Sequence, residues 1–128
     1  MKGRIGAVSL LVADYDTAIA WFRDKLDFRL ASDTDMGEGK RWVIMSPGGG
    51  GTNILLARAD GEEQRAVIGN QTGGRVFLFL DTDYFDASHA AMLKAGVAFL
   101  ESPRNESYGK VAVFRDLCGN KWDLIERR

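Results

Sequence analysis

The sequence predicts an α+β fold in which two βαβββ modules follow each other in one chain. Two observations support this prediction. The expected order of one strand, one helix and three strands occurs twice within 128 residues, and such a recurring order indicates an internal repeat. Each half has one amphipathic helix for four strands, so the helix covers only one face of its sheet. The expected bounds are residues 1–59 for module one, 60–74 for a linker and 75–128 for module two.

Composition excludes several classes of function. The net charge is −1 and 27% of residues are charged, without the basic stripe that a nucleic-acid partner requires. No apolar run approaches the roughly 20 residues of a membrane span. The run Ile5 to Val12 is followed at once by Asp14 and Asp16, which favours a buried strand over a signal peptide. The single Cys118 rules out an internal disulfide framework, so a cytoplasmic location is expected.

Module one contains one helix among its strands. Tyr15 to Leu26 carries apolar residues at helical spacing, and Asp14 or Asp16 is placed to cap it. Asp33 to Lys40 is expected to be a polar turn, and Trp42 a core residue. The expected strands are Arg4–Val12, Phe28–Ser32, Arg41–Met45 and Asn53–Arg58.

Module two repeats this order after the polar linker. A helix is expected from Tyr84 to Ala95, with Gly96 at the position after its C-cap. Pro103 to Gly109 is expected to be a loop, and His89 is expected on a solvated or half-exposed helix face. The expected strands are Arg75–Asp81, Val97–Leu100 and the two arms of a closing hairpin within Lys110–Glu126.

The closing hairpin is the most informative stretch. Its arms carry β-branched and aromatic residues at period two, and they flank a turn at Asp116 to Asn120. Asp123 lies in the middle of the second, otherwise apolar arm. A buried carboxylate requires a partner, a metal or a ligand.

These features resemble the vicinal oxygen chelate superfamily, which includes glyoxalase I, extradiol dioxygenases, and fosfomycin- and bleomycin-resistance proteins. The resemblance is carried by Val8-Ser-Leu-Leu-Val-Ala-Asp14 running into Ala18-Ile-Ala-Trp-Phe22, and by Phe114-Arg-Asp-Leu-Cys-Gly-Asn-Lys-Trp-Asp-Leu-Ile125. In the second stretch Leu117 and Cys118 replace the Pro-Asp of the family signature. The resemblance implies curved mixed sheets that enclose a cavity, and the fold hosts many chemistries.

In metal-dependent members of that superfamily, four side chains from the first and last strands of the two modules hold a divalent ion. The positions that match are Ala7, Leu55, Arg75 and Asp123. Ala7 and Leu55 have no donor atoms, and Arg75 is a permanent cation. No cofactor is therefore expected. A divalent metal bound at Asp123 is the alternative.

Strand alternation places the remaining candidate residues. If Asp123 faces the cavity, Lys121 and Ile125 do so as well. The ligand-binding candidates on the other strands and in the loop before the hairpin are Ala7, Ser9, Leu55, Phe77, Phe79 and Tyr108. A mostly apolar pocket with few polar groups is typical of a small-molecule site. Tyr108 is either a residue of the pocket rim or a loop-packing residue.

Arg75 and Asp123 admit two interpretations. They form either a structural ion pair or a catalytic or ligand-orienting pair. An ion pair would lower the pKa of Asp123 and weaken it as a base, which favours binding over proton abstraction.

Three hypotheses for the function follow. The first is a metal-independent protein, similar to the bleomycin-resistance branch, that binds an apolar or aromatic ligand as a homodimer. The second is a lyase, isomerase or dioxygenase-type enzyme that uses Asp123, with an atypical metal site or none. The third is a module that serves mainly as a partner of another protein or as a structural subunit.

Overall fold

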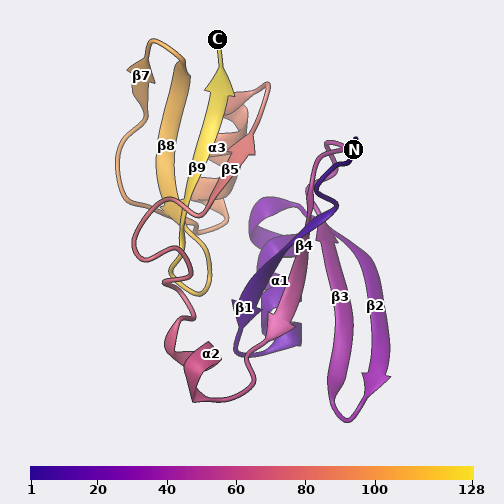
Figure 1. The fold of residues 1–128 in the computed structure, drawn as a ribbon. Coiled ribbons are helices and arrows are strands. Elements are labelled where there is room, and N and C mark those ends of the chain that lie inside the picture. Colours follow the sequence, from indigo (N-terminus) through magenta and orange to yellow (C-terminus); the bar gives the residue numbers. More distant parts are fainter. The chain divides into compact units, whose positions relative to one another are not determined.

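The computed structural model describes residues 1–128, which form two compact units, Met1–Ile68 and Gly69–Arg128 (Figure 1). Each unit contains one mixed sheet and one long helix. The α+β class and the repeated module order predicted from the sequence are confirmed. No helix has the length and apolar character needed to cross a bilayer.

The first unit has a four-stranded sheet in the order β1-β4-β3-β2. The β1–β4 pair is parallel, and the other pairs are antiparallel. The elements are β1 (Ala7–Val12), α1 (Tyr15–Leu26), β2 (Arg29–Gly37), β3 (Lys40–Ser46), β4 (Asn53–Arg58) and the short α2 (Glu62–Ala66). Helix α2 lies within the expected linker.

The predicted bounds of α1 are confirmed. Asp14 is its N-cap, and one carboxylate oxygen of Asp14 accepts hydrogen bonds from the backbone N–H and the hydroxyl of Thr17, both at 2.8 Å. These hydrogen bonds lower the pKa of Asp14. The apolar face of α1 is buried with one face of the sheet. The buried residues are Tyr15, Ala18, Ile19 and Phe22 on α1 and Leu10, Val12, Val43, Met45 and Leu56 on the strands.

Two expectations for the first unit are wrong. The polar stretch 33–40 is mostly strand, because β2 continues to Gly37 and β3 starts at Lys40. Only Glu38 and Gly39 form the turn, and both have positive φ. Trp42 is 47% exposed rather than buried, because its neighbour Val43 occupies the buried face and adjacent strand residues point to opposite faces.

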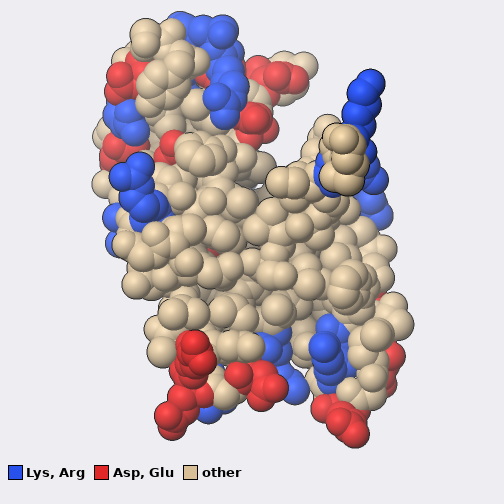
Figure 2. Space-filling model, in the orientation of Figure 1, with Lys and Arg blue, Asp and Glu red and all other residues tan.

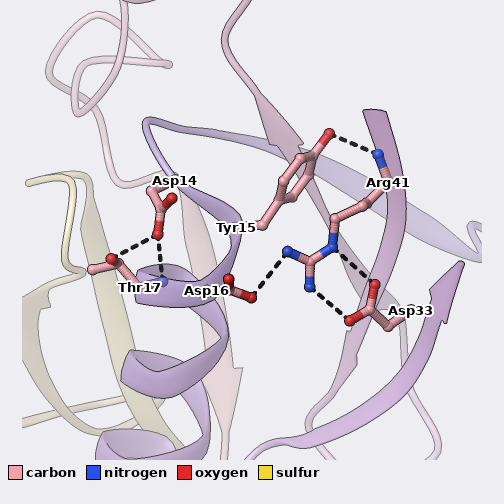
Figure 3. A network of polar contacts seen from close by, with 6 residues as sticks. All are labelled: Asp14, Tyr15, Asp16, Thr17, Asp33 and Arg41. Carbon is pink, nitrogen blue, oxygen red and sulfur yellow. Dashed lines mark hydrogen bonds and ion pairs between the residues drawn. The ribbon is translucent and has the colours of Figure 1, made fainter. Parts of the chain in front are cut away.

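An ionic network explains how such polar residues form an ordered hairpin (Figure 3). The Arg41 guanidinium on β3 donates to both carboxylate oxygens of Asp33 on β2, at 3.1 and 2.7 Å, and to Asp16 on α1 at 2.9 Å. The Tyr15 hydroxyl accepts a hydrogen bond from the Arg41 backbone N–H at 3.2 Å. The network therefore joins the hairpin to the first turn of α1.

The second unit repeats the topology, with β5 parallel to the last strand and the order β5-β9-β8-β6. Its elements are β5 (Leu78–Asp81), α3 (Phe85–Lys94), β6 (Ala98–Phe99), β7 (Arg104–Glu106), β8 (Gly109–Arg115) and β9 (Lys121–Arg127). Both β6 and β7 pair with β8, so together they occupy the edge that β2 fills in the first unit. The expected loop 103–109 is therefore largely strand.

Helix α3 starts without a side-chain cap of its own. Instead Glu126 on β9 accepts a hydrogen bond from the Phe85 N–H at 2.8 Å, which places a carboxylate at the positive end of the helix. The His89 ring lies 5.6 Å from the Phe85 ring and 4.5 Å from the Phe99 ring. His89 is half-buried among aromatic side chains.

The turn of the closing hairpin is built around Asp116, which is 5% exposed. Its carboxylate accepts hydrogen bonds from the backbone N–H groups of Cys118, Gly119 and Asn120, at 2.9, 3.0 and 3.1 Å. It also accepts from the Asn120 amide at 3.1 Å and the Trp122 indole at 2.9 Å. The Asp116 side chain thus accepts hydrogen bonds from the backbone N–H groups of the turn and from a core tryptophan.

Gly69 packs directly against this turn. A Cβ atom at Gly69 would lie 2.1 Å from the carbonyl oxygen of Cys118, and the φ of Gly69 is +80°. We expect Gly69→Ala to destabilise the protein by about 2–3 kcal/mol, because the backbone of the turn must move. Gly73 is the matched control: its φ is +67°, and a Cβ atom added there would have no atom within 4 Å.

Gly73→Ala should cost only about 1 kcal/mol, from the left-handed backbone alone. Urea unfolding followed by tryptophan fluorescence measures both variants. Equal losses for the two would show that close packing on the turn contributes nothing.

Candidate functional site

Asp123 lies in the middle of β9, and its register neighbours are Phe79 on β5 and Val113 on β8. Because directly paired residues share a face of the sheet, the three side chains form one row. Trp122 and Leu124 are buried on the opposite face. The hairpin thus places a carboxyl group between an aromatic and an aliphatic side chain.

The buried carboxyl group of Asp123 lacks a full set of hydrogen bonds. It is 9% exposed, and its buried Oδ1 has no hydrogen-bond partner. Burial raises the pKa of Asp123 above the ordinary aspartate value, the nearby Arg104 lowers it by less, and Glu101 raises it further. A larger fraction of this group is therefore protonated near neutral pH than for an ordinary aspartate.

A pocket of about 490 Å³ lies in the second unit beside this row. Its walls are mostly apolar, with charged side chains among them. Phe79 is 57% exposed and Leu100 is 45% exposed, so apolar surface is open to a ligand. The lining residues are Gly74, Arg75, Val76, Phe79, Leu100, Glu101, Val113 and Lys121.

Arg75 does not pair with Asp123. It lies in the turn before β5, where its backbone carbonyl accepts a hydrogen bond from the Thr72 hydroxyl at 2.6 Å. The ion pairs of the chain do not include Arg75 or Asp123. The interpretation of these two residues as an ion pair is therefore wrong, and the lowered pKa expected for Asp123 is replaced by a raised one.

Glu101 lies at the edge of the pocket, and both of its carboxylate oxygens accept hydrogen bonds. Its Oε1 accepts from the Arg104 Nε at 3.0 Å, and its Oε2 accepts from the Val113 backbone N–H at 2.9 Å. The Arg104 Nη1 also donates to Glu106 at 2.8 Å. Sequence reasoning missed Leu100 and Glu101 as pocket residues, because only pairing with β8 brings this segment to the site.

The other candidates occupy separate places. In the first unit Ser9 on β1 pairs with Leu55 on β4, and Ala7 lies two residues earlier on the same face. In the second unit the Phe77 ring contacts the Trp122 ring edge-on, with 6.4 Å between centroids, and Phe77 is not a lining residue of the pocket. Tyr108 is 49% exposed beside the start of β8.

Cys118 does not have the properties of a nucleophile. Burial, with a smaller contribution from the Asp116 charge, raises the pKa of its thiol to about 11. The thiol is therefore protonated at neutral pH, and the thiolate is the reactive form.

These observations define a class: a duplicated βαβββ protein with a mostly apolar pocket, lined in part by Phe79, on one sheet. The family model described as Glyoxalase/Bleomycin resistance protein/Dioxygenase superfamily matches residues 4–124. The chain belongs to this family.

Similar proteins cover nearly the whole chain. An uncharacterized protein of Shewanella frigidimarina (strain NCIMB 400) is 50% identical over 98% of this chain and 95% of its own length. The crystal structure of UcmS2 has a TM-score of 0.85 and 29% identity, and the match covers 98% of both chains. TnmS3, an antibiotic-binding protein from Streptomyces sp. CB03234, has a TM-score of 0.79 and 26% identity, with 99% of this chain and 98% of its own covered.

The residues present do not fit the metal that the family resemblance implies. Ala7 lies eight residues before Tyr15, where α1 begins. The residue eight positions before Phe85, where α3 begins, is Phe77. Phe77, not Arg75, is therefore the counterpart of Ala7. Neither Ala7 nor Phe77 has a donor atom. No group of three or more His, Cys, Asp or Glu side chains is placed to hold a metal ion.

Proposed function

We propose that this protein binds a small apolar or aromatic molecule, without a metal, in the pocket beside β5 and β9. The observation that carries the proposal is the half-exposed Phe79 in a pocket of about 490 Å³. Such surface is costly to leave in water and favours a ring-bearing ligand. The likeness to an antibiotic-binding protein supports the same class of function. A homodimer in the cytoplasm is part of the proposal.

Binding of N-phenyl-1-naphthylamine, an uncharged aromatic dye whose fluorescence rises in apolar sites, tests the proposal. We expect Phe79→Ala to weaken binding about 10-fold, since buried aromatic contact contributes on the order of 1–2 kcal/mol. Tyr84→Ala is the matched control, because Tyr84 is 75% exposed and does not line the pocket. Dialysis against EDTA should leave the affinity unchanged. Loss of binding after chelation would refute metal independence.

A second candidate function is favoured by one observation. Asp123 is a buried carboxyl with a raised pKa, and such a group is a better general base at neutral pH than an ordinary aspartate. It could take a proton from a bound carbonyl compound. An enzyme of this kind would lose turnover in Asp123→Asn while keeping its affinity for the dye, whereas a pure binding protein has no turnover to lose.

A further inference from the structure

We propose that the ligand of this pocket is an organic anion, and that Arg75 and Lys121 bind its acidic group while Phe79 and Leu100 contact its ring. This inference rests on the proposed function and adds the chemical class of the ligand. It follows from how the charges around the pocket are partnered.

Both cations line the pocket. The Lys121 Nζ is 3.4 Å from the carbonyl oxygen of Gly74, the residue directly before Arg75 in the chain. Neither cation forms an ion pair with a carboxylate of this chain. In contrast, Arg41, Arg104 and Arg127 are each bound to acidic side chains. Two positive charges are thus available to a ligand at the pocket wall.

Glu101, the acidic residue of the lining, does not cancel the two positive charges. Both oxygens of Glu101 are already occupied by Arg104, at 3.0 and 3.1 Å, and one of them also by the Val113 N–H. Arg104, which is shared with Glu106, offsets part of the charge of Glu101, and with two cations and one carboxylate the lining keeps a positive excess. The chain as a whole carries −1. Figure 2 shows that the visible face carries both cationic and acidic residues, with uncharged surface between them.

The apolar side of the pocket fixes the rest of the ligand. Phe79 and Leu100 are exposed at 57% and 45%, and Val76 and Val113 complete an apolar wall. A ring that contacts this wall brings an attached carboxylate, sulfonate or phenolate to the two cations. Arginine suits such oxygen anions because its guanidinium can donate two parallel hydrogen bonds to a carboxylate or sulfonate.

Two dyes distinguish the contribution of charge to binding from the contribution of ring contact. 8-Anilinonaphthalene-1-sulfonate and N-phenyl-1-naphthylamine share one ring skeleton, and only the first carries a sulfonate. We expect the native protein to bind the sulfonate dye about 10-fold more tightly. The double variant Arg75→Gln/Lys121→Gln should remove this preference and leave the affinity for the uncharged dye within about two-fold.

The control is Arg29→Gln/Lys94→Gln. It also removes one arginine and one lysine charge, but from exposed residues outside the pocket. It should preserve the preference for the sulfonate dye. Equal affinity of the native protein for the two dyes would overturn the inference and leave the proposed binding function standing. The inference also fails if the control variant loses the preference as the test variant does. If neither dye binds the native protein, the proposed function fails as well.

Discussion

Asp116→Ala is expected to destabilise the protein by about 3–5 kcal/mol, because one substitution removes five hydrogen bonds from a buried turn. The loss removes the side-chain acceptor of three backbone N–H groups and of the Trp122 indole, in a turn that is buried at Asn120 and half-buried at Cys118 and Gly119. Such a loss is a large part of the stability of an ordinary domain. Urea unfolding followed by tryptophan fluorescence measures it.

Asp35→Ala is the matched control. Asp35 also lies in a hairpin, where its carboxylate accepts one hydrogen bond from the Gly37 N–H at 2.8 Å in an exposed position. Its removal should cost at most about 1 kcal/mol. Asp116→Asn should fall between the two, since the amide keeps the shape and one acceptor oxygen but loses the charge. A similar loss for Asp116→Ala and Asp35→Ala would mean that the buried network does not stabilise the hairpin.

Asp123→Asn is expected to stabilise the protein near pH 7 by about 1–3 kcal/mol, because it removes a buried charge that lacks a hydrogen-bond partner at Oδ1. The gain depends on pH. The raised pKa of Asp123 in the folded protein means that the folded state favours the protonated form. The contribution of the Asp123 carboxyl to the free energy of unfolding is fully present below its pKa in the unfolded chain, about 3.9. This contribution is lost as pH rises through its pKa in the folded protein.

The difference between Asp123→Asn and the native protein should therefore be small near pH 3.5 and grow as pH rises. Thermal unfolding at a series of pH values measures it. Asp81→Asn is the control, because Asp81 is largely exposed and its carboxylate pairs with Arg127 at 2.9 Å. That variant should show no such gain. A constant difference across the pH range would show that burial does not raise the pKa of Asp123 in the folded protein.

Amphipathic elements were predictable from the sequence. Helix α1 was predicted with its observed bounds, because the helical spacing of its core residues and the capping residue Asp14 are local signals. The polar strands at the sheet edges were not predictable from the sequence. Strand β2 beyond Ser32 and strand β7 have no buried alternating face, and they are ordered by cross-strand contacts such as that of Arg41 with Asp33.

The candidate site was predictable in part. A carboxylate in an apolar strand identified Asp123 as unusual, and its burial without a hydrogen-bond partner at Oδ1 agrees with this. Its supposed partner was wrong, because β5 begins at Leu78 and Arg75 lies in the preceding turn. Strand period alone cannot show where a strand begins, and boundaries are the least reliable part of such predictions.

The sequence by itself determined the α+β class and the duplicated topology, and it identified Asp123 as an unusual carboxylate in an apolar strand. These depend on residue type and short-range spacing. Only the tertiary structure decided which charges are neutralised and which face the pocket. It brought Leu100 and Glu101 beside β8, engaged Glu101 with Arg104, and left Arg75 and Lys121 without acidic partners. Charge pairing depends on side chains far apart in the chain, and folding alone sets the distances between them.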